Sequence, residues 1–505
     1  MKSVFDQGPP PPCPTPFNMA AHVLAHAGDM PDKVALSVLH DGTSDDWPFG
    51  DLERAVRATG TGLLRAGLTP GQIVLMRLGN TVDFPIAYLG AIAAGLVPVP
   101  TSSQLTRAET AVMIADLSPG AVLHDPAVAC AAHPRIINVA DLRAMRALPP
   151  CDWHMGDPDR MGYIVYTSGT SGKPRAVAHA HRAIWARRMM VKGWYDLGPE
   201  DRLCHAGAFN WTYTLGTGLM DPWAIGATAL IPAPGSDIAA LPALLARHKA
   251  TIFAAAPGVY RKMLQGVTRM DAPSLRHGLS AGEKLSRPLH DAWRAATGTD
   301  LYEAYGMSEC STFISSSPAH PAHADALGQP QQGRRVAILG PDGPVEMGAE
   351  GTIAIARDDP GLMLGYLGAP DETAARMMGD WFVTGDRGVM APNGQITYQG
   401  RDDDMMNAGG YRVSPLEVEA ALAHFPTLTQ IGVTQVEVKP GVRIIAAFYT
   451  APAPLDEAAL DAYVNDKLAR YKHPRAYIHL PSLPSGANGK LQRRALPGLF
   501  KARPK

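Results

Sequence analysis

A ten-residue stretch, YTSGTSGKPR at residues 166–175, brings hydroxyl side chains, two glycines and two cations together. The chain before it, MGYIV, reads as a short buried strand, and the chain after it, AVAHAHRAIWARRMM, can be read as a helix. Glycine-rich loops in such places often hold phosphate, because their backbone N–H groups can turn toward an anion. The stretch therefore predicts phosphate chemistry, and a flexible surface turn is the alternative. The candidate phosphate ligands are Thr167, Ser168, Gly169, Thr170, Ser171, Gly172 and Lys173.

This loop does not have the pattern of a Walker A loop. That motif needs a second glycine five residues before the one that precedes its lysine, and Ser or Thr after the lysine. Thr167 and Pro174 occupy those two positions, so the hydroxyl that would reach Mg²⁺ is absent. A loop whose hydroxyls and amides bind the β- and γ-phosphates of a nucleotide, with pyrophosphate as the leaving group, fits the residues better.

Length, charge and cysteine usage exclude several classes of protein. The chain has 505 residues, more than one ordinary core holds, so we expect two or more domains. Its formal net charge of −1 argues against a nucleic-acid or anionic-membrane surface. Five scattered cysteines without a CxxC pair indicate reduced thiols in a cytoplasmic protein. His179 and His181 lack further ligands nearby, so a metal role is disfavoured.

The sequence predicts no targeting or membrane segment. The N-terminal MKSVFDQGPPPPCPTPF lacks the apolar core of a signal peptide, and its proline run reads as an extended arm. The longest apolar run, residues 85–100, falls short of the roughly 20 residues that a membrane helix needs. We interpret this run as a buried helix that leads into a strand.

The elements that must position the loop alternate between helix and strand from about residue 20 to about 400. Helical patterns at 51–68 and 83–95 alternate with apolar strands at 72–78 and 97–100. This order is typical of an α/β fold with mainly parallel sheets flanked by helices. After about residue 335, short strands separated by Gly, Asp and Asn turns predict a small β-rich subdomain.

The last hundred residues look like a small, independent α+β unit. Ser414 and Glu417 have the spacing of a capping box at the start of an amphipathic helix, and two strands and a second helix follow. The preceding GRDDDMMNAGG, residues 400–410, is too polar for a core and reads as a hinge, with a solvated turn as the alternative. We therefore predict an N-terminal domain at residues 1–402 and a mobile C-terminal domain at residues 403–505.

Six segments in chain order resemble the acyl-adenylating (AMP-forming) superfamily of acyl-CoA synthetases, carrier-loading adenylation domains and luciferases. The phosphate loop resembles the signature loop of that family, and five further segments follow it along nearly the whole chain. These are SAGEKL (280–285), LYEAYGMSEC (301–310), WFVTGDRGVM (381–390), GRDDDMMNAGGYRVSPLEVEAAL (400–422) and PSGANGKLQRR (484–494). These five further motifs follow the loop in the same order as in the family, which makes a chance resemblance negligible.

The resemblance implies a site for ATP and Mg²⁺. Tyr305 would stack on adenine, Asp386 would accept hydrogen bonds from the ribose, and Arg401 would contact ribose or phosphate. Glu309 would help to hold Mg²⁺, which prefers oxygen ligands. The other residues of the implied nucleotide site are Gly282, Glu283, Lys284, Glu303, Ala304, Gly306, Met307 and Ser308.

Two positions depart from the usual pattern of the family. Ser308 stands where threonine is usual, and because the hydroxyl is kept we expect little effect. Arg175 stands where lysine is more common, which keeps the charge but changes the geometry of a phosphate contact.

The resemblance makes Lys490 the catalytic lysine. Attack of a carboxylate on the α-phosphorus joins two anions, so a lysine between them would offset the repulsion and orient the attack. The family's C-terminal domain then rotates about a hinge aspartate, which maps to Asp403, before a thiol attacks the acyl group. The rotation would remove Lys490, and Gly409 and Gly410 would let the pantetheine arm pass close to the backbone.

Residues 205–227 resemble the acyl pocket of the acetate, medium-chain and benzoate branch. Acetate-specific relatives carry a tryptophan where this chain has Met307, so we expect room for more than two carbons. No Lys, Arg or His clearly marks a site for a dicarboxylate. The expected lining, some of which can instead be ordinary core, is Phe209, Trp211, Tyr213, Met307 and Phe313.

We therefore expect a cytoplasmic, AMP-forming carboxylate–CoA ligase, monomeric or homodimeric, that uses ATP, Mg²⁺ and coenzyme A. Its substrate would be a short- or medium-chain or aromatic monocarboxylate, and no nucleic-acid partner or membrane span is expected. A stand-alone enzyme that loads an acyl group onto a carrier protein remains the alternative. Intact Glu309, Asp386 and Lys490 weigh against a non-catalytic binding homologue.

Overall fold

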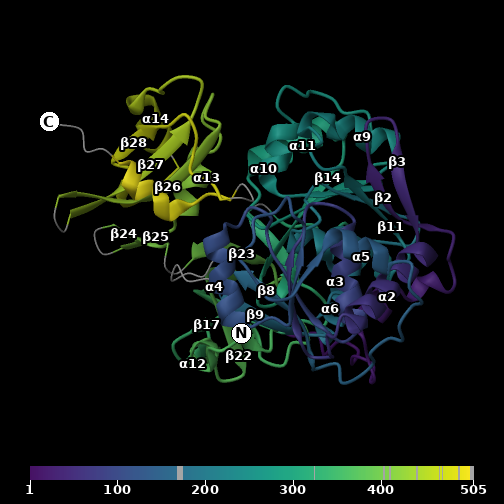
Figure 1. Ribbon diagram of the computed structural model, residues 1–505. Coiled ribbons are helices and arrows are strands. Elements are labelled where there is room, and N and C mark those ends of the chain that lie inside the picture. Colours follow the sequence, from purple (N-terminus) through teal and green to yellow (C-terminus); the bar gives the residue numbers. More distant parts are fainter. Residues whose placement is uncertain are drawn as a thin grey trace.

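The protein has an α/β fold built from a large mixed sheet, smaller sheets and a C-terminal lobe (Figure 1). The computed structural model describes residues 1–167, 175–323, 325–401, 404–408, 411–439, 442–465, 467–468, 470–486 and 490–500. The large sheet, its flanking helices and the small C-terminal lobe confirm the predicted α/β fold class.

The large sheet, sixteen strands within these ranges, has a mainly parallel half and an antiparallel half. The mainly parallel half consists of β2 (Val34–Leu39), β3 (Ser44–Pro48), β10 (Arg202–His205), β11 (Thr228–Pro232), β12 (Ile252–Ala255), β13 (His277–Ala281) and β14 (Asp300–Met307). The antiparallel half consists of β1 (Val4–Phe5), β15 (Ser311–Ser315), β16 (Ala326–Pro330), β17 (Val336–Gly340), β18 (Gly343–Pro344), β19 (Glu350–Ala356), β21 (Met377–Met378), β22 (Trp381–Met390) and β23 (Ile396–Arg401). Because β14 pairs with β15, the predicted β-rich segment continues the large sheet and is not a sheet of its own.

Helices lie beside the parallel half, and one of them shows how an apolar stripe is buried. In α11 (Arg287–Thr297) the buried residues Leu289, Trp293 and Ala296 follow the helical period, and Gly298 ends the helix in the left-handed region at a φ of 73°. The other helices of this part are α1 (Met19–Val23), α6 (Arg182–Ala186), α7 (Arg188–Met190), α8 (Asp221–Ala224), α9 (Leu241–Arg247) and α10 (Pro257–Met263). The short helix α12 (Pro370–Ala374) follows the strand β20 (Gly365–Tyr366).

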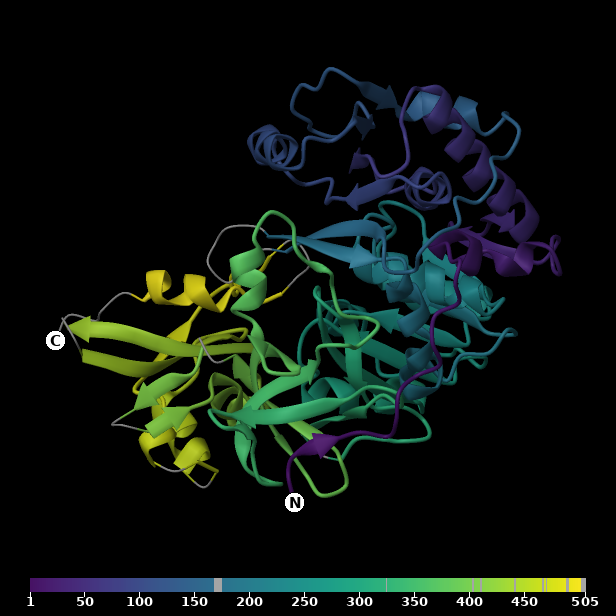
Figure 2. The ribbon, with the colours of Figure 1, turned by 90° about the horizontal axis from the view of Figure 1, so that it is seen from below.

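A separate four-stranded parallel sheet is formed by the N-terminal part of the chain and lies far from the C-terminal lobe in Figure 2. The apolar run that was expected to begin as a buried helix does so: all eleven residues of α3, the helix at 83–93, are buried. None of the helices in the described ranges is long and apolar enough to cross a membrane. The elements of this part are α2 (Phe49–Arg65), β4 (Ile73–Arg77), α3 (Asp83–Ala93), β5 (Val97–Pro100), α4 (Arg107–Leu117), β6 (Ala121–His124), β7 (Ile136–Asn138) and α5 (Val139–Met145).

The segment after the phosphate loop is a strand, so the expected helix there is wrong. Strand β9 (Arg175–Ala180) pairs antiparallel with β8 (Met161–Thr167) on one side and with β20 (Gly365–Tyr366) on the other. Its five residues after Arg175 are buried, and the helix α6 begins only at Arg182. Two partner strands outweigh the helical propensity of the alanines, so the loop connects two strands and has no helix N-terminus behind it.

The C-terminal lobe packs helices on a three-stranded sheet, as predicted (Figure 1). The expected capping box is wrong: Ser414 is the N-cap, but its hydroxyl donates to the Gln399 carbonyl, and Glu417 pairs with Lys472. The N-cap side chain therefore joins the lobe to β23. The elements are β24 (Met406–Ala408), β25 (Tyr411–Val413), α13 (Pro415–Leu422), β26 (Gln430–Lys439), β27 (Val442–Thr450), α14 (Glu457–Asn465) and β28 (Ala476–His479).

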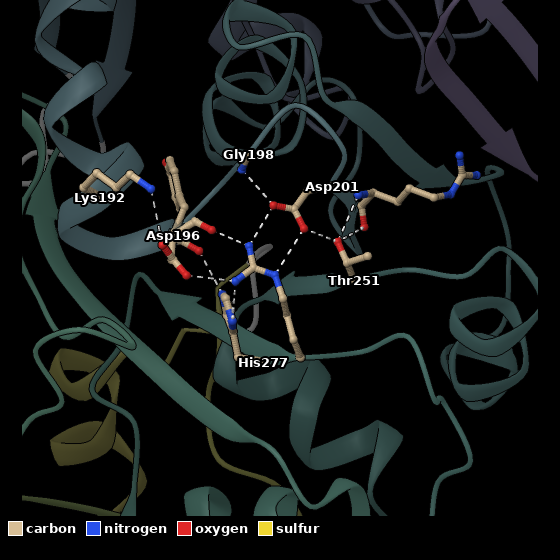
Figure 3. A network of polar contacts seen from close by, with 9 residues as sticks. Lys192, Asp196, Gly198, Asp201, Thr251 and His277 are labelled. Atoms are coloured by element: carbon tan, nitrogen blue, oxygen red, sulfur yellow. Dashed lines mark hydrogen bonds and ion pairs between the residues drawn. The ribbon is translucent and has the colours of Figure 1, made fainter.

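A network of ion pairs closes the end of the parallel sheet at which β10 and β13 begin (Figure 3). The Arg276 guanidinium donates to Asp201 from Nη2 at 2.7 Å and from Nε at 3.1 Å, and to Asp196 from Nη1 at 3.2 Å. Thr251 Oγ1 and the Gly198 N–H also donate to Asp201. Burial opposes ionisation of Asp201, but these hydrogen bonds outweigh it and lower its pKa.

We predict that Arg276→Gln lowers the free energy of unfolding by roughly 1 kcal/mol at pH 7, after allowing for solvent screening. A lowered carboxyl pKa stabilises the fold above its unfolded value, and this contribution is lost as pH falls through the folded pKa. The penalty should therefore shrink in acid. Urea unfolding at several pH values measures it, with Arg247→Gln, whose exposed pair with Asp41 should matter little, as the control. Equal penalties for the two variants would contradict this.

Candidate active site

An open cleft of about 3300 Å³ lies between the large sheet and the C-terminal lobe, and both contribute to its walls. It collects the greater part of the predicted site from segments far apart in the sequence. The predicted residues that line it are Trp211, Tyr213, Gly282, Glu283, Lys284, Glu303, Ala304, Tyr305, Gly306, Met307, Ser308, Glu309, Asp386, Arg401 and Lys490.

The core of the phosphate loop lies outside the described residues, as do the hinge and the two implied pantetheine glycines. Of Thr167 only its place at the end of β8 is described. Arg175, the departure from the family's lysine, lines the cleft and pairs with Glu372. The predicted residues outside the described ranges are Ser168, Gly169, Thr170, Ser171, Gly172, Lys173, Asp403, Gly409 and Gly410.

Strand β14 ends in an irregularity that turns the YGMSE segment toward the cleft. Its register with β15 shifts between Tyr305 and Gly306. A Cβ atom at Gly306 would lie 2.1 Å from the Ser311 carbonyl oxygen, so the two strands can approach this closely only at a glycine. This close approach places the residues of β14 and the turn after it at the cleft wall.

A buried carboxylate joins the residues that were expected to hold adenine and ribose. The Tyr305 hydroxyl donates to Asp386 Oδ2 at 2.6 Å, and the Tyr398 hydroxyl donates to Oδ1 at 3.4 Å. Arg401 Nη1 lies 3.7 Å from Oδ1, across the register pair of β22 and β23. Burial raises the pKa of Asp386, although these hydrogen bonds and the charge of Arg401 act against it. Sequence reasoning missed Tyr398. The sequence shows it only as an aromatic residue on β23, the strand that pairs with the strand of Asp386.

Glu309 is placed to hold a cation through one oxygen. Its Oε1 accepts a 2.7 Å hydrogen bond from the Tyr366 hydroxyl, and its side chain is buried. Its Oε2 has no hydrogen-bond partner within the described ranges, and no group of three or more His, Cys, Asp or Glu side chains there could hold a metal ion. This fits Mg²⁺, which is usually held by one or two carboxylates together with substrate phosphates.

Two further carboxyls in the wall have raised pKa values. Burial raises the pKa of Glu303 to about 7, although its Oε1 accepts the Leu285 N–H at 2.7 Å. Burial also raises the pKa of Glu283, against the positive charges of Arg261, 3.7 Å away, and of Lys490. The wall expected to face adenine therefore carries less negative charge than its composition suggests.

Lys490 reaches the cleft from the C-terminal lobe. It is exposed, and it lies close enough to Asp386 and Glu283 that its charge opposes the rise in pKa that burial causes at both carboxyls. Arg493, three residues later, anchors its segment by donating to Glu419 on α13, with Nη2 3.2 Å from Oε2. The lysine is therefore presented by a segment fixed to a helix of the same lobe.

Two residues expected in the acyl pocket lie in the core, which corrects the prediction. The side chain of Phe209 is fully buried, and its backbone N–H donates to Asn80 Oδ1 at 2.6 Å. Phe313 is fully buried and packs edge-on against Tyr305, with 5.3 Å between ring centroids. Neither lines the cleft, because Phe209 and Phe313 each belong to a buried apolar cluster.

The inner part of the cleft contains residues that sequence reasoning missed. Tyr163, His179 and Arg187 line it together with Trp211 and Tyr213. His179 stacks on Tyr163 with 4.8 Å between ring centroids, and its Nε2 lies 2.7 Å from the Ser308 carbonyl oxygen. Burial lowers the pKa of His179 to about 4, so the ring is neutral near pH 7. The HAH segment at residues 179–181 was the sequence signal for this position, but its pattern suggests only metal binding and not a place in the cleft wall.

With this geometry established, the comparison with known families is decisive. The AMP-binding enzyme family matches residues 23–367, and the AMP-binding enzyme C-terminal domain matches residues 417–490. The chain belongs to the AMP-binding enzyme family. The resemblance to the acyl-adenylating superfamily and its CoA-ligase branch is thereby confirmed.

Members of this family with known names are similar over nearly the full chain. Benzoate--CoA ligase of Thauera aromatica is 29% identical over 88% of this chain and 90% of its own length. The mitochondrial acyl-coenzyme A synthetase ACSM3 of Homo sapiens is 28% identical over 98% of this chain and 91% of its own. The crystal structure of a benzoate CoA ligase from Burkholderia xenovorans LB400 is 27% identical with a TM-score of 0.84, covering 95% of this chain and 99% of that one.

We predict that Glu303→Gln removes a pH dependence of stability from this AMP-binding enzyme. A carboxyl with a raised folded pKa stabilises the fold fully below its unfolded pKa, and the contribution is lost as pH rises through about 7. The wild type should lose up to roughly 3 kcal/mol of unfolding free energy over that range. The glutamine keeps an acceptor for the Leu285 N–H, so the variant should lose little. Chemical denaturation at pH 5 and pH 8 measures both proteins, and identical pH profiles would contradict this.

Proposed function

We propose that the protein is an AMP-forming carboxylate–CoA ligase that acts on a short- or medium-chain or aromatic monocarboxylate. The observation that carries the proposal is the meeting of Lys490, from the C-terminal lobe, with the Tyr305–Asp386 pair of the large sheet in one cleft. A nucleotide held at that pair would present its α-phosphate to a lysine that the lobe supplies. The similarity to named CoA ligases supports the same reaction.

The reaction would proceed in two steps. A carboxylate oxygen attacks the α-phosphorus of ATP, the P–O bond to the β-phosphate breaks, and acyl-adenylate and pyrophosphate form. The thiolate of coenzyme A then attacks the acyl carbon, the bond to AMP oxygen breaks, and the acyl thioester and AMP leave. Mg²⁺, when bound, supplies charge neutralisation for the phosphates.

Different residues of the cleft would bind the nucleotide, hold Mg²⁺ and orient the reacting carboxylate. Tyr305 would stack on adenine, and Asp386 with Arg401 would hold the ribose. Glu309 would hold Mg²⁺ through its Oε2. Lys490 would lie between the two reacting anions, where its charge offsets their repulsion and orients the attack.

We propose the domain division at residues 402 and 403 and a rotation about Asp403 between the two steps. The anchoring of Arg493 within the lobe supports a rigid carrier for Lys490. A cytoplasmic location accords with the five cysteines, all free in the structure, and we propose a monomer or a homodimer.

Pyrophosphate and AMP release against a panel of carboxylates, with and without coenzyme A, tests the function. Acetate, butyrate, hexanoate, benzoate and malonate sample chain length, ring and second charge. Turnover that needs one acid and rises strongly with coenzyme A is the expected result. Release that stalls near one equivalent despite coenzyme A would indicate a carrier-loading enzyme instead, and no AMP with any acid would indicate a binding protein.

We predict that Lys490→Ala lowers acyl-adenylate formation by about 10²–10³-fold, because one electrostatic contact to the transition state is lost. Thioester formation from supplied acyl-adenylate should be largely retained, since the lysine would act only in the first step. Rapid-quench assays of each step measure the split. Lys472→Ala, in the same lobe and paired with Glu417, is the control and should leave both steps near wild type. An equal loss of rate in both steps would contradict the proposal that Lys490 acts only in acyl-adenylate formation.

A further inference from the structure

The wall of the inner cleft contains a buried ion pair that the proposed function does not use. The side chain of Arg187 is 13% exposed and that of Asp221 is 3% exposed. Arg187 Nε and Nη2 donate to the two Asp221 oxygens at 2.8 and 2.6 Å, and the Tyr195 hydroxyl donates to Oδ2 at 2.6 Å. Arg187 lines the cleft, and Asp221 is buried behind it.

The pair makes this end of the cleft polar but neutral. Asp221 already balances the Arg187 charge through a two-bonded contact, which fixes the guanidinium as well as neutralising it. A second carboxylate on the substrate would have to be buried without a free cation, and burying an uncompensated charge is strongly unfavourable. His179 offers no charge either, because burial lowers its pKa to about 4. The wall therefore disfavours a diacid.

One hydroxyl in this wall is left able to donate a hydrogen bond. Arg187 Nη1 donates to Ser311 Oγ, and within the described ranges no acceptor takes the Ser311 hydroxyl proton. Ser311 lines the cleft beside Met307, its register partner on β14. Its φ of 62° lies in the left-handed region, an unusual conformation for serine, and such strain is concentrated at functional sites.

Other polar groups of the same wall lack partners within the described ranges. The Tyr213 hydroxyl and His179 Nδ1 are buried and form no hydrogen bond there, although both residues line the cleft. Because His179 Nε2 donates to the Ser308 carbonyl, its Nδ1 is an acceptor. A buried polar group without a partner is energetically unfavourable, and a ligand that hydrogen-bonds to it can recover part of that cost. The wall thus offers a donor and an acceptor without a net charge.

We propose that the acid activated by this protein carries a neutral hydroxyl substituent, and that Ser311 is the residue that selects it. This inference rests on the proposed function. The Ser311 hydroxyl donates to the substituent, and the Arg187–Asp221 pair holds Ser311 in place and rejects a second carboxylate. A site built to hydrogen-bond a substrate hydroxyl discriminates strongly against an analogue without one.

Pairs of acids of nearly equal size test this, because they differ only in a hydroxyl or a methyl group. Suitable pairs are 3-hydroxybenzoate with 3-methylbenzoate and 4-hydroxybutyrate with pentanoate, and isophthalate serves as a diacid. The wild type should favour the hydroxy acid of the better-used pair at least about tenfold in kcat/KM, and isophthalate should be the poorest aromatic acid. Equal kcat/KM values within each pair would overturn the proposal.

Substitution of Ser311 tests the assignment of the residue. Ser311→Ala should lower the hydroxy-to-methyl ratio of kcat/KM about tenfold, and Ser311→Thr, which keeps a hydroxyl, should restore part of it. Ser315→Ala is the matched control on the same strand, because Ser315 is buried and donates to the Gly193 carbonyl away from the cleft. An unchanged ratio in Ser311→Ala, or an equal fall in Ser315→Ala, would overturn the assignment.

Calorimetric binding of the same acids separates this proposal from the function on which it rests. A protein that makes no AMP but binds the hydroxy acid about tenfold more tightly than its methyl partner would refute the ligase and keep the selectivity. A protein that makes acyl-CoA with both acids equally would keep the ligase and refute the selectivity.

Discussion

The hydrogen bond from the Tyr305 hydroxyl to the buried Asp386 carboxylate is the contact on which the site depends. Tyr305 ends the parallel half of the large sheet and Asp386 lies in its antiparallel half, so the bond joins the two parts across intervening strands. A buried carboxylate is costly unless it is hydrogen-bonded, and Tyr398 and Arg401 supply the remaining contacts. The turn that carries Glu309 and the segment that brings Lys490 from the C-terminal lobe line the same cleft as this pair.

The two ends of the cleft differ in charge. The end at the C-terminal lobe carries positively charged side chains, whereas the inner part has no net charge. Cations gather where the lobe meets the sheet, and Lys490 there faces carboxyls whose pKa values burial has raised, such as Asp386. In the inner part, Arg187 is neutralised by Asp221, and His179 is uncharged. The end of the cleft at the lobe therefore presents positive charge, whereas its inner part presents hydrogen-bonding groups without net charge.

Local pattern was a sound guide where an element's own residues determine its structure. The helices at 51–68 and 83–95, and the strands between them, follow from hydrophobic periodicity and burial of whole apolar runs. The strand β9 did not follow, because its alanines are compatible with helix and only its two partner strands decide against it. Ser414 likewise has the spacing of a capping box, yet a carbonyl on β23 takes its hydroxyl.

The sequence by itself determined the family, the order of the motifs and the motif residues that line the cleft, such as Tyr305, Asp386 and Lys490, since these belong to local strings with recognisable chemistry. Only the tertiary structure decided which aromatic residues face the cleft, placing Phe209 and Phe313 in the core and Tyr163 in the wall. It also decided that Arg187 is paired with Asp221, 34 positions away. The physical reason is that burial and charge balance depend on side chains that meet in space, and no pattern within one segment records such a meeting.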